Sequence, residues 1–236
     1  MTAGADQLHM FAKYWAPGSV KTRLARAIGA AAASRLYREM LVTLLRRLDQ
    51  LADRRVLVYW PPERMSSFAA VAGSRWCLEP QVEGDLGARM KQHLAHCLAS
   101  GARRVVLIGS DSPTLPTARI REAFSLLRDY PLVLGPTHDG GYYLIGLRDI
   151  LPPVFEGVAW GTPQVWPDTI RRLQASGHPH AELTPWYDVD DQADLQCLRA
   201  EVGALVATDA SWLPLWSLLR QLAPSPLGGN PPPSRT

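Results

Sequence analysis

One segment limits the fold of this chain more than any other, Val105–Pro113, with the sequence VVLIGSDSP. Its first part is apolar and β-prone, as in a parallel strand buried on both faces, and a Gly-Ser pair then leads to Asp111. In an open α/β sheet, ligands bind at the carboxyl ends of the strands. Asp111 is therefore a candidate ligand for a metal–phosphate group. The alternative is a helix N-cap, because Asp favours turns and caps and a helix is expected near Thr117.

Strands and helices alternate along the chain, which predicts βαβ units and an α/β fold with a mainly parallel central sheet. Strands are expected at 8–12, 56–60, 105–109, 132–134 and 142–147. Helices are expected at 36–48, 63–72, 85–99, 120–127, 162–175, 192–200 and 212–222. With no repeat or internal linker, residues 1–223 are predicted to form a single domain, and the Pro-, Gly- and Ser-rich residues 224–236 a disordered tail.

The composition excludes several classes of function. The chain has 25 basic and 22 acidic residues, a net charge of +3, which is too small an excess for a nucleic-acid-binding protein. Its 3 cysteines are scattered and lack a C-x-x-C spacing, so a disulfide framework is not expected. The N-terminus does not read as a signal peptide and no apolar run has membrane-spanning length, so we expect a cytoplasmic protein without a membrane partner.

A basic loop, Phe11–Leu24, follows the first expected strand and precedes a helix. Backbone N–H groups and the helix dipole bind phosphate in this setting. Lys13, Lys21 and Arg23 add three cations, and a guanidinium can hold phosphate oxygens bidentately. The loop matches neither the Walker pattern nor G-x-G-x-x-G. The alternative interpretation is a solvated basic turn.

The segment Gln81–Met90 contains two glycines that would allow a ligand to approach the backbone closely. Asp85 is a candidate ligand contact, although capping of the following helix explains it equally well. Arg89 lies one turn into that helix and either faces a cleft or forms a surface salt bridge.

A third segment, Gly135–Leu147, contains Asp-Gly-Gly, which is a hairpin turn signal. The functional alternative is that His138 and Asp139 lie at a strand exit, where Gly140 and Gly141 would let a sugar or base lie against the main chain.

Near the C-terminal end, the segment Trp186–Asp191 places three carboxylates within four residues before a helix. Either Asp190 or Asp191 is expected to cap that helix. Asp188 is left as a candidate cation ligand, since Mg²⁺ is usually held by one or two carboxylates together with substrate phosphates.

Two further features have ordinary explanations. His93, His96 and Cys97 share an expected helix and could be drawn as a zinc site, but a helix surface is the commoner explanation. The apolar helix at 212–222 would suit a lipid surface, yet core packing or a contact in a homodimer is commoner.

Six motifs in this order resemble the GT-A-type nucleotide-diphosphosugar transferase superfamily, over roughly residues 8 to 200. They are F-A-K-x-x-x-P-G-x-V-K-T-R-L (11–24), G-D-L-G-x-R-M (84–90), G-S-D-S-P-T-L-P (109–116), D-G-G-Y-Y-L-I-G-L (139–147), W-G-T-x-x-V (160–165) and Y-D-V-D-x-x-x-D-L (187–195). The nearest resemblance is to a bacterial family of glycosyltransferases long described as a domain of unknown function (DUF2064-like). Phospholactate and molybdenum-cofactor guanylyltransferases are more distantly similar. The resemblance implies a single-domain, Rossmann-like GT-A fold with helices on both faces of the sheet.

The resemblance also implies roles for individual residues. Residues implied to contact the nucleotide or its phosphates are Lys13, Lys21, Thr22, Arg23, Asp85, Arg89, Gly140 and Gly141. Asp111 falls at the position of the metal-binding aspartate, with Asp188 or Asp190 as a second carboxylate, and the implied cofactor is Mg²⁺ or Mn²⁺. Two departures are Trp15, where a second proline is more usual, and Ser110-Asp111-Ser112 in place of Asp-x-Asp.

We therefore expect a metal-dependent transferase that moves a sugar from a nucleotide-diphosphosugar to a small acceptor. Asp139 is the candidate catalytic base, with His138 as the alternative. Two other functions remain open: a guanylyltransferase-like nucleotidyltransferase that releases pyrophosphate from a nucleoside triphosphate, and a non-catalytic nucleotide-binding protein.

Overall fold

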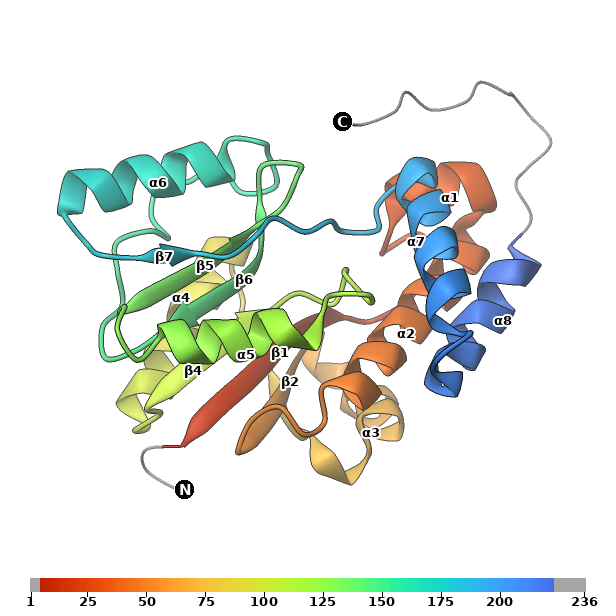
Figure 1. The fold of residues 1–236 in the computed structure, drawn as a ribbon, viewed down its shortest axis with the longest axis horizontal. Helices are drawn as coiled ribbons and strands as arrows, with labels where there is room; N and C mark the ends of the chain where they lie inside the picture. Colours follow the sequence, from red (N-terminus) through yellow and green to blue (C-terminus); the bar gives the residue numbers. More distant parts are fainter. Residues whose placement is uncertain (1–4, 223–236) are drawn as a thin grey trace.

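A seven-stranded sheet in the order β3-β2-β1-β4-β6-β5-β7 forms the centre of the protein, which is described by a computed structural model over residues 5–222 (Figure 1). The strands are β1 Asp6–Lys13, β2 Arg54–Trp60, β3 Cys77–Pro80, β4 Arg104–Ile108, β5 Leu132–Pro136, β6 Tyr142–Leu147 and β7 Ala181–Glu182. Neighbouring strands are parallel except on either side of β6, which runs antiparallel to β4 and β5.

Helices cover both faces of this sheet. They are α1 Thr22–Ile28, α2 Ala30–Arg47, α3 Met65–Ala72, α4 Leu86–Ala99, α5 Thr117–Leu126, α6 Val165–Ser176, α7 Gln192–Leu205 and α8 Leu213–Gln221, with 3-10 turns at Pro62–Arg64, Gly73–Arg75 and Ala210–Trp212. One core contains residues of α2, α3 and α5, and the core on the opposite face contains residues of α4 and α6. A third cluster joins α1, α7 and α8 to α2 at one end of the sheet (Figure 1).

The apolar run that ends at Asp111 is the buried strand β4. Its residues alternate between the two cores: Val106 and Ile108 belong to one, and Val105 and Leu107 to the other. A strand that is buried on both faces reads as a continuous apolar run rather than as an alternating pattern. The predicted α/β class, the mainly parallel sheet and the helices on both faces are therefore confirmed.

The structure also decides several alternatives about helix ends. Asp85 caps α4 by accepting a hydrogen bond from the Ala88 backbone N–H at 2.8 Å. Of the two C-terminal candidates, Asp191 is the cap of α7. Asp111 does not cap a helix, since the N-cap of α5 is Pro116. Capping thus accounts for Asp85 and leaves Asp111 without that explanation.

The sequence prediction missed the edge strands β3 and β7, and it placed one uninterrupted helix where a 3-10 turn precedes α3. The apolar face of α8 packs into the helical cluster, with Leu215, Leu218 and Leu219 buried. Within residues 5–222, no helix has the length and hydropathy of a membrane span. The predicted tail at 224–236 lies outside the described residues.

A largely buried ion pair fastens the start of β1 to β4. Arg104, whose side chain is 9% exposed, binds both oxygens of Asp6 at 2.7 Å and donates to the Phe124 carbonyl. Asp6→Asn would leave this guanidinium charge without its counter-ion, so we expect a loss of about 3 kcal/mol of unfolding free energy in denaturant titrations. Glu122→Gln breaks the more exposed Arg119–Glu122 pair and should cost less than about 1 kcal/mol. Equal losses in the two variants would contradict this account.

Candidate functional site

The order of the strands creates a crevice between β1 and β4. From β1 the chain moves to β2 and β3 on one side, and it then crosses back to β4 on the other side of β1. The loops that leave the carboxyl ends of β1 and β4 therefore diverge, and such a switch point is where α/β sheets bind ligands. The basic loop leaves β1 at this point, and Asp111 leaves β4.

The ammonium group of Lys21 holds these two loops together. Its Nζ forms an ion pair with Asp111 and a second one with Asp190 Oδ1 at 2.9 Å, and its side chain is only 3% exposed. Burial alone would favour the neutral amine, but the two carboxylates outweigh it and raise the pKa of Lys21. The basic loop and the carboxylate of β4 thus converge on one place.

Asp190 is shared between two cations. Its Oδ2 lies 2.5 Å from Arg23 Nη2, while its Oδ1 accepts from Lys21. Burial opposes ionisation of Asp190, but the two ion pairs outweigh burial and lower the pKa of its carboxyl. Asp190 is therefore ionised whenever these cations are in place.

Asp188 is the carboxylate of this group whose ionised form is least stabilised by its surroundings. It accepts a hydrogen bond from Ser112 Oγ at 2.6 Å. Burial, and then the charge of Asp111, raise the pKa of Asp188 to about 7. A cation placed between Asp111 and Asp188 would relieve this repulsion, so the pair has the electrostatics of a cation site.

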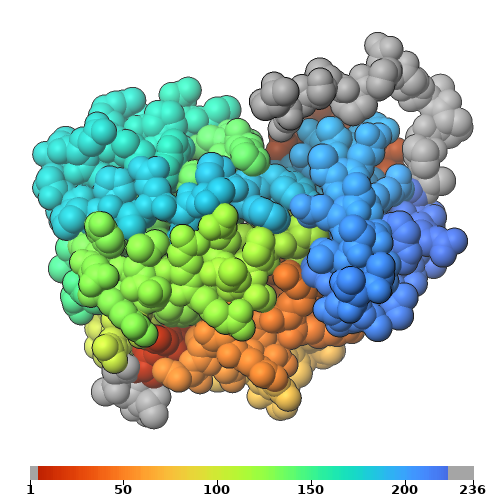
Figure 2. All heavy atoms as spheres, viewed as in Figure 1, coloured from red at the N-terminus to blue at the C-terminus, as the bar shows by residue number. Residues whose placement is uncertain are grey.

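The 183–191 segment carries Asp188 and Asp190 to the crevice. Figure 2 shows the region around β7 and this segment crossing the surface between α6 and α7. Backbone hydrogen bonds fix its path: the Trp186 N–H donates to Pro136, and the Val189 N–H donates to the Asp111 carbonyl at 2.9 Å. Asp188 and Asp190, the neighbours of Val189, are thereby held beside Asp111.

A buried tyrosine supports the other side of the crevice. The Tyr37 hydroxyl of α2 lies 2.7 Å from Ser110 Oγ and accepts from the Lys13 backbone N–H at 3.0 Å. It therefore joins the ends of β1 and β4. Burial raises the pKa of Tyr37 to about 12, so it serves as a neutral hydrogen-bonding group.

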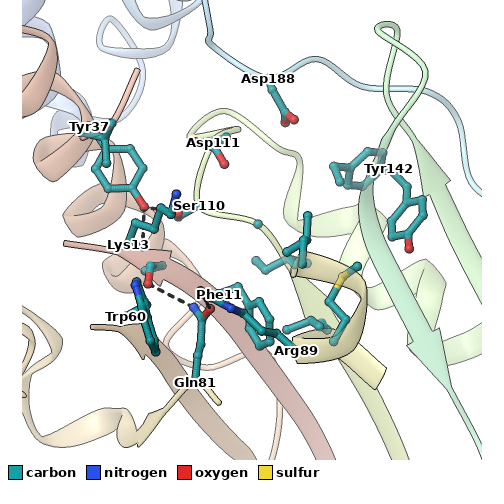
Figure 3. A pocket seen from close by; sticks show the side chains of 18 of the residues that line it. Phe11, Lys13, Tyr37, Trp60, Gln81, Arg89, Ser110, Asp111, Tyr142 and Asp188 are labelled. Carbon is teal, nitrogen blue, oxygen red and sulfur yellow. Dashed lines mark hydrogen bonds between the residues drawn. The ribbon is translucent and has the colours of Figure 1, made fainter. Parts of the chain in front are cut away.

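A cavity of about 580 Å³ opens beside these charges and is lined by residues of both sheet halves. Figure 3 shows Asp111 and Asp188 at one end and Phe11, Trp60, Gln81 and Arg89 at the other. Its size is typical of a small-molecule site. One end is charged, and the other, apart from Gln81 and Arg89, is mainly aromatic and apolar.

Arg89 is positioned within the apolar end. Its guanidinium lies 4.2 Å from the centroid of the Trp60 ring, and it donates to the Gly84 carbonyl at 2.8 Å and to Gln81 Oε1 at 3.4 Å. Gln81 in turn donates to the backbone of β1 and β2. The contacts of Arg89 are thus those of a cavity wall rather than of the surface salt bridge that was the alternative.

The oxygen atoms of the crevice carboxylates are suitable ligands for a hard cation, but the three carboxylates are not arranged as one three-ligand site. Oxygen ligands match Mg²⁺ or Mn²⁺, and one or two protein carboxylates are enough when substrate phosphates complete the shell. The three carboxylates do not, however, converge closely enough to form a three-ligand site. Among the described residues, the three potential ligands whose atoms all lie within 4.8 Å of one another are His9, His93 and Cys97. Two of the three acidic side chains at the crevice, rather than all three, therefore form the reasonable ligand set.

The predicted site residues fall into two groups. Six of them line the cavity: Lys13, Lys21, Arg89, Asp111, Asp188 and Asp190. The others lie outside its lining: Thr22, Arg23, Asp85, His138, Asp139, Gly140 and Gly141.

The Asp-Gly-Gly segment organises the β5–β6 turn. Asp139 Oδ1 accepts from Thr137 Oγ1 at 2.5 Å and from the Gly141 N–H at 3.3 Å. A Cβ on Gly140 would lie 2.4 Å from the Pro163 carbonyl oxygen, so this glycine is required for packing within the chain. The ligand roles of Asp139, Gly140 and Gly141 stay predictions, and their contacts here are those of a turn.

Several residues of the site were not foreseen from the sequence. Tyr37, Trp60 and Gln81 line the cavity, and Ser112 holds Asp188. Trp60 ends a strand and Ser112 lies in the same motif as Asp111, so their positions could have suggested the site. Tyr37 reads only as one apolar position of an amphipathic helix.

Comparisons with solved structures define the fold class. A 4-diphosphocytidyl-2C-methyl-D-erythritol synthase from Anaerococcus prevotii DSM 20548 superposes with a TM-score of 0.58 at 10% identity, covering 85% of this chain and 99% of that one. A cytidylyltransferase from Leptospira borgpetersenii serovar Hardjo-bovis (strain JB197) gives 0.54 at 12% identity, with 92% and 94% covered. The protein has the α/β fold of nucleotide-diphospho-sugar transferases and cytidylyltransferases.

The family follows from closer matches. A structure from Desulfovibrio desulfuricans G20, described as a "putative nucleotide-diphospho-sugar transferase", is 33% identical, covers 92% of this chain and 97% of that one, and has a TM-score of 0.83. The profile of the family DUF2064, "Uncharacterized protein conserved in bacteria", matches residues 44–162. The chain belongs to the DUF2064 family. A search of curated proteins found no match.

The raised pKa of Asp188 predicts a dependence of stability on pH. The folded protein keeps this proton up to about pH 7, whereas an unfolded chain loses it near pH 4. Between these values the folded state binds more protons, so the contribution of Asp188 to stability falls as pH rises. Asp188→Asn removes this loss, and its unfolding free energy relative to wild type should rise with pH, by at most about 1.4 kcal/mol per unit. In an Asp111→Asn background the window should move to lower pH. A difference that stays flat between about pH 4 and pH 7 would contradict the prediction.

Proposed function

We propose that this protein is a metal-dependent transferase that uses a nucleotide-activated donor, and that it transfers the sugar of a nucleotide-diphosphosugar to a small acceptor. The observation that carries the proposal is the meeting of Lys21 with Asp111 and Asp190 at the charged end of a cavity. Cations and carboxylates together at a strand switch point suit a diphosphate with its divalent cation.

In this proposal the basic loop takes the diphosphate. Lys13 and Lys21 line the cavity, and Arg23 reaches its edge through Asp190. When the bond between sugar and diphosphate breaks, negative charge grows on the leaving phosphate, and fixed cations beside it lower the barrier. Thr22 lies between two of these cations in the chain, and its contact with the nucleotide stays a prediction.

The cation is assigned to Asp111 together with Asp188 or Asp190. Mg²⁺ or Mn²⁺ at this position would supply further stabilisation of the leaving diphosphate. Asp188 is fixed by Ser112, and Asp190 by Lys21 and Arg23, so each carboxylate is already oriented. Ordered carboxylates reduce the reorganisation that cation binding would require.

The apolar end of the cavity is assigned to the nucleoside and the sugar. Trp60 and Phe11 offer aromatic faces, and Arg89 provides a donor that is held in place. Asp139, with His138 as its alternative, stays our candidate for the base that accepts the proton of the acceptor hydroxyl. Because both lie on the β5–β6 turn, the acceptor would approach from that side.

The relative from D. desulfuricans, with its nucleotide-diphospho-sugar transferase description, supports glycosyl transfer. The cytidylyltransferases share only the fold, so nucleotidyl transfer with release of pyrophosphate is the alternative. A nucleotide donor and a small acceptor are the proposed partners. The cytoplasmic location and a homodimer stay predictions.

The metal role of Asp111 can be tested by binding. We expect Asp111→Asn to bind a nucleoside diphosphate in the presence of Mn²⁺ at least about tenfold more weakly than wild type, a loss of about 1.4 kcal/mol. Isothermal titration with and without Mn²⁺ measures this. Asp168→Asn, which changes an aspartate on α6 that pairs with Arg171, is the matched control and should bind as wild type does. Equal affinities for Asp111→Asn and wild type would remove Asp111 from the site.

Analysis of the products distinguishes glycosyl transfer from nucleotidyl transfer. With nucleotide sugars, Mn²⁺ and a panel of acceptors, we expect release of a nucleoside diphosphate. Lys21→Met should lower turnover about a hundredfold or more, because a charge beside the leaving phosphate is lost. Lys91→Met, which breaks an exposed pair with Glu156, should keep full activity. Pyrophosphate release from a nucleoside triphosphate would instead favour nucleotidyl transfer, and binding without turnover of either donor would favour a non-catalytic protein.

A further inference from the structure

A cluster of metal-ligating side chains lies in the core, apart from the carboxylates of the crevice. It consists of His9 in the middle of β1 and His93 and Cys97 on α4. All three are buried, with exposures of 1%, 9% and 4%. The spacing of four residues places His93 and Cys97 on one face of α4, and that face packs against β1. The exposed His96 does not take part.

The distances between the ligand atoms are close to those of a tetrahedral zinc site. His9 Nδ1 lies 2.8 Å from His93 Nε2, and Cys97 Sγ lies 3.6 Å from His93 Nε2 and 3.9 Å from His9 Nδ1. With zinc bonds of about 2.05 Å to nitrogen and 2.3 Å to sulfur, tetrahedral angles require about 3.35 Å between two nitrogens and 3.55 Å between nitrogen and sulfur. To admit the ion, the two nitrogens would have to separate by about half an ångström. The Cys97 side chain would also have to turn toward His9 Nδ1, because its Sγ lies equally far from both His9 nitrogens.

A neighbouring amide prepares His9 for this role. Gln7 Oε1 lies 3.0 Å from His9 Nε2, and because a carbonyl oxygen only accepts, this nitrogen must carry the hydrogen. The lone pair of His9 then lies on Nδ1, which faces His93 Nε2, whereas Cys97 Sγ lies 3.9 Å from each of the two ring nitrogens of His9. Histidines that bind metals usually donate their other N–H to an oxygen in this way.

Three titratable side chains lie around the cluster: Arg54, Glu79 and His96. Arg54 and Glu79 form an ion pair of 2.7 Å, which reduces the positive charge that a bound cation would meet.

We propose that His9, His93 and Cys97 bind a structural zinc ion. Two imidazoles and a thiolate favour Zn²⁺ over the hard cations that suit the crevice. On binding, the Cys97 thiol releases its proton to solvent, and the proton on His93 moves from Nε2 to Nδ1. The three protein ligands leave one coordination position open, unlike the four-ligand sites of zinc fingers. The ion would tie β1 to α4 beneath Phe11, whose ring lies 5.5 Å from that of His93 and which lines the cavity.

Cobalt substitution tests the proposal, because tetrahedral Co²⁺ with a thiolate ligand gives a charge-transfer band in the near ultraviolet and strong visible bands. Full-length protein stripped with a chelator should bind one equivalent of Co²⁺ with these bands, and one equivalent of Zn²⁺ should displace it. Zn²⁺ should also raise the thermal midpoint of the stripped protein.

Variants of this chain provide the controls. Cys97→Ser should lose the charge-transfer band while its far-ultraviolet circular dichroism is kept, and His93→Asn should weaken Co²⁺ binding at least tenfold. Cys77→Ser and Cys197→Ser, at exposed thiols, should keep the band. Asp111→Asn should keep it as well, which separates this site from the crevice. Absence of the band in wild type, or its persistence in Cys97→Ser, would overturn the proposal and leave a hydrogen-bonded histidine pair.

Discussion

The buried ammonium of Lys21 is the interaction on which the architecture of the site depends. Removing such a charge from water costs several kcal/mol unless counter-ions replace the solvent, and Asp111 and Asp190 supply them from β4 and from the 183–191 segment. Three distant parts of the chain are thus held together by one charge. Under the proposed function, a diphosphate would offer Lys21 an alternative counter-ion, and the carboxylates would then be free to share a divalent cation. The same charge that organises the crevice would therefore couple phosphate binding to metal binding.

The topology explains why this charge lies where it does. Because the chain passes from β1 to one side of the sheet and returns to β4 on the other, the loops that leave the carboxyl ends of these two strands diverge. The antiparallel β6 then lies beside β4, and its pairing with β5 directs the β5–β6 turn toward the 183–191 segment, where the His138 N–H donates to Trp186. The backbone of that turn therefore helps to support the segment that carries Asp188.

Much of this could be predicted from the sequence, and the exceptions have physical causes. The buried strands are recognisable because their burial requires continuous apolar runs, whereas β3 is short, partly exposed and ends in a proline, and β7 has only two residues. Asp111 and the basic loop could be placed at one edge because parallel strands align their carboxyl ends. The hydrogen-bond partners of individual side chains could not be predicted. The hydrogen bond between Tyr37 and Ser110 joins residues 73 positions apart, and an amphipathic pattern does not distinguish one buried hydroxyl group. His9 is a similar case, since one polar residue within a strand gives no sign of the helix that will pack on it.

The motifs that suggested a ligand site contain glycines whose requirement is steric rather than functional. A Cβ on Gly87 would lie 2.0 Å from Trp160 Nε1, and one on Gly135 would lie 2.5 Å from the Tyr143 ring. Gly87 belongs to the G-D-L-G motif and Trp160 to the W-G-T motif, so these two motifs form one packing unit although 73 positions separate the residues. The Trp160 ring also contacts that of Tyr142, which lines the cavity. The close approach permitted by Gly87 thus fixes the loop that carries Trp160 against the start of α4, where Arg89 is anchored. Part of the resemblance of these motifs to transferase motifs therefore reflects the packing of the cavity wall rather than contacts with a ligand.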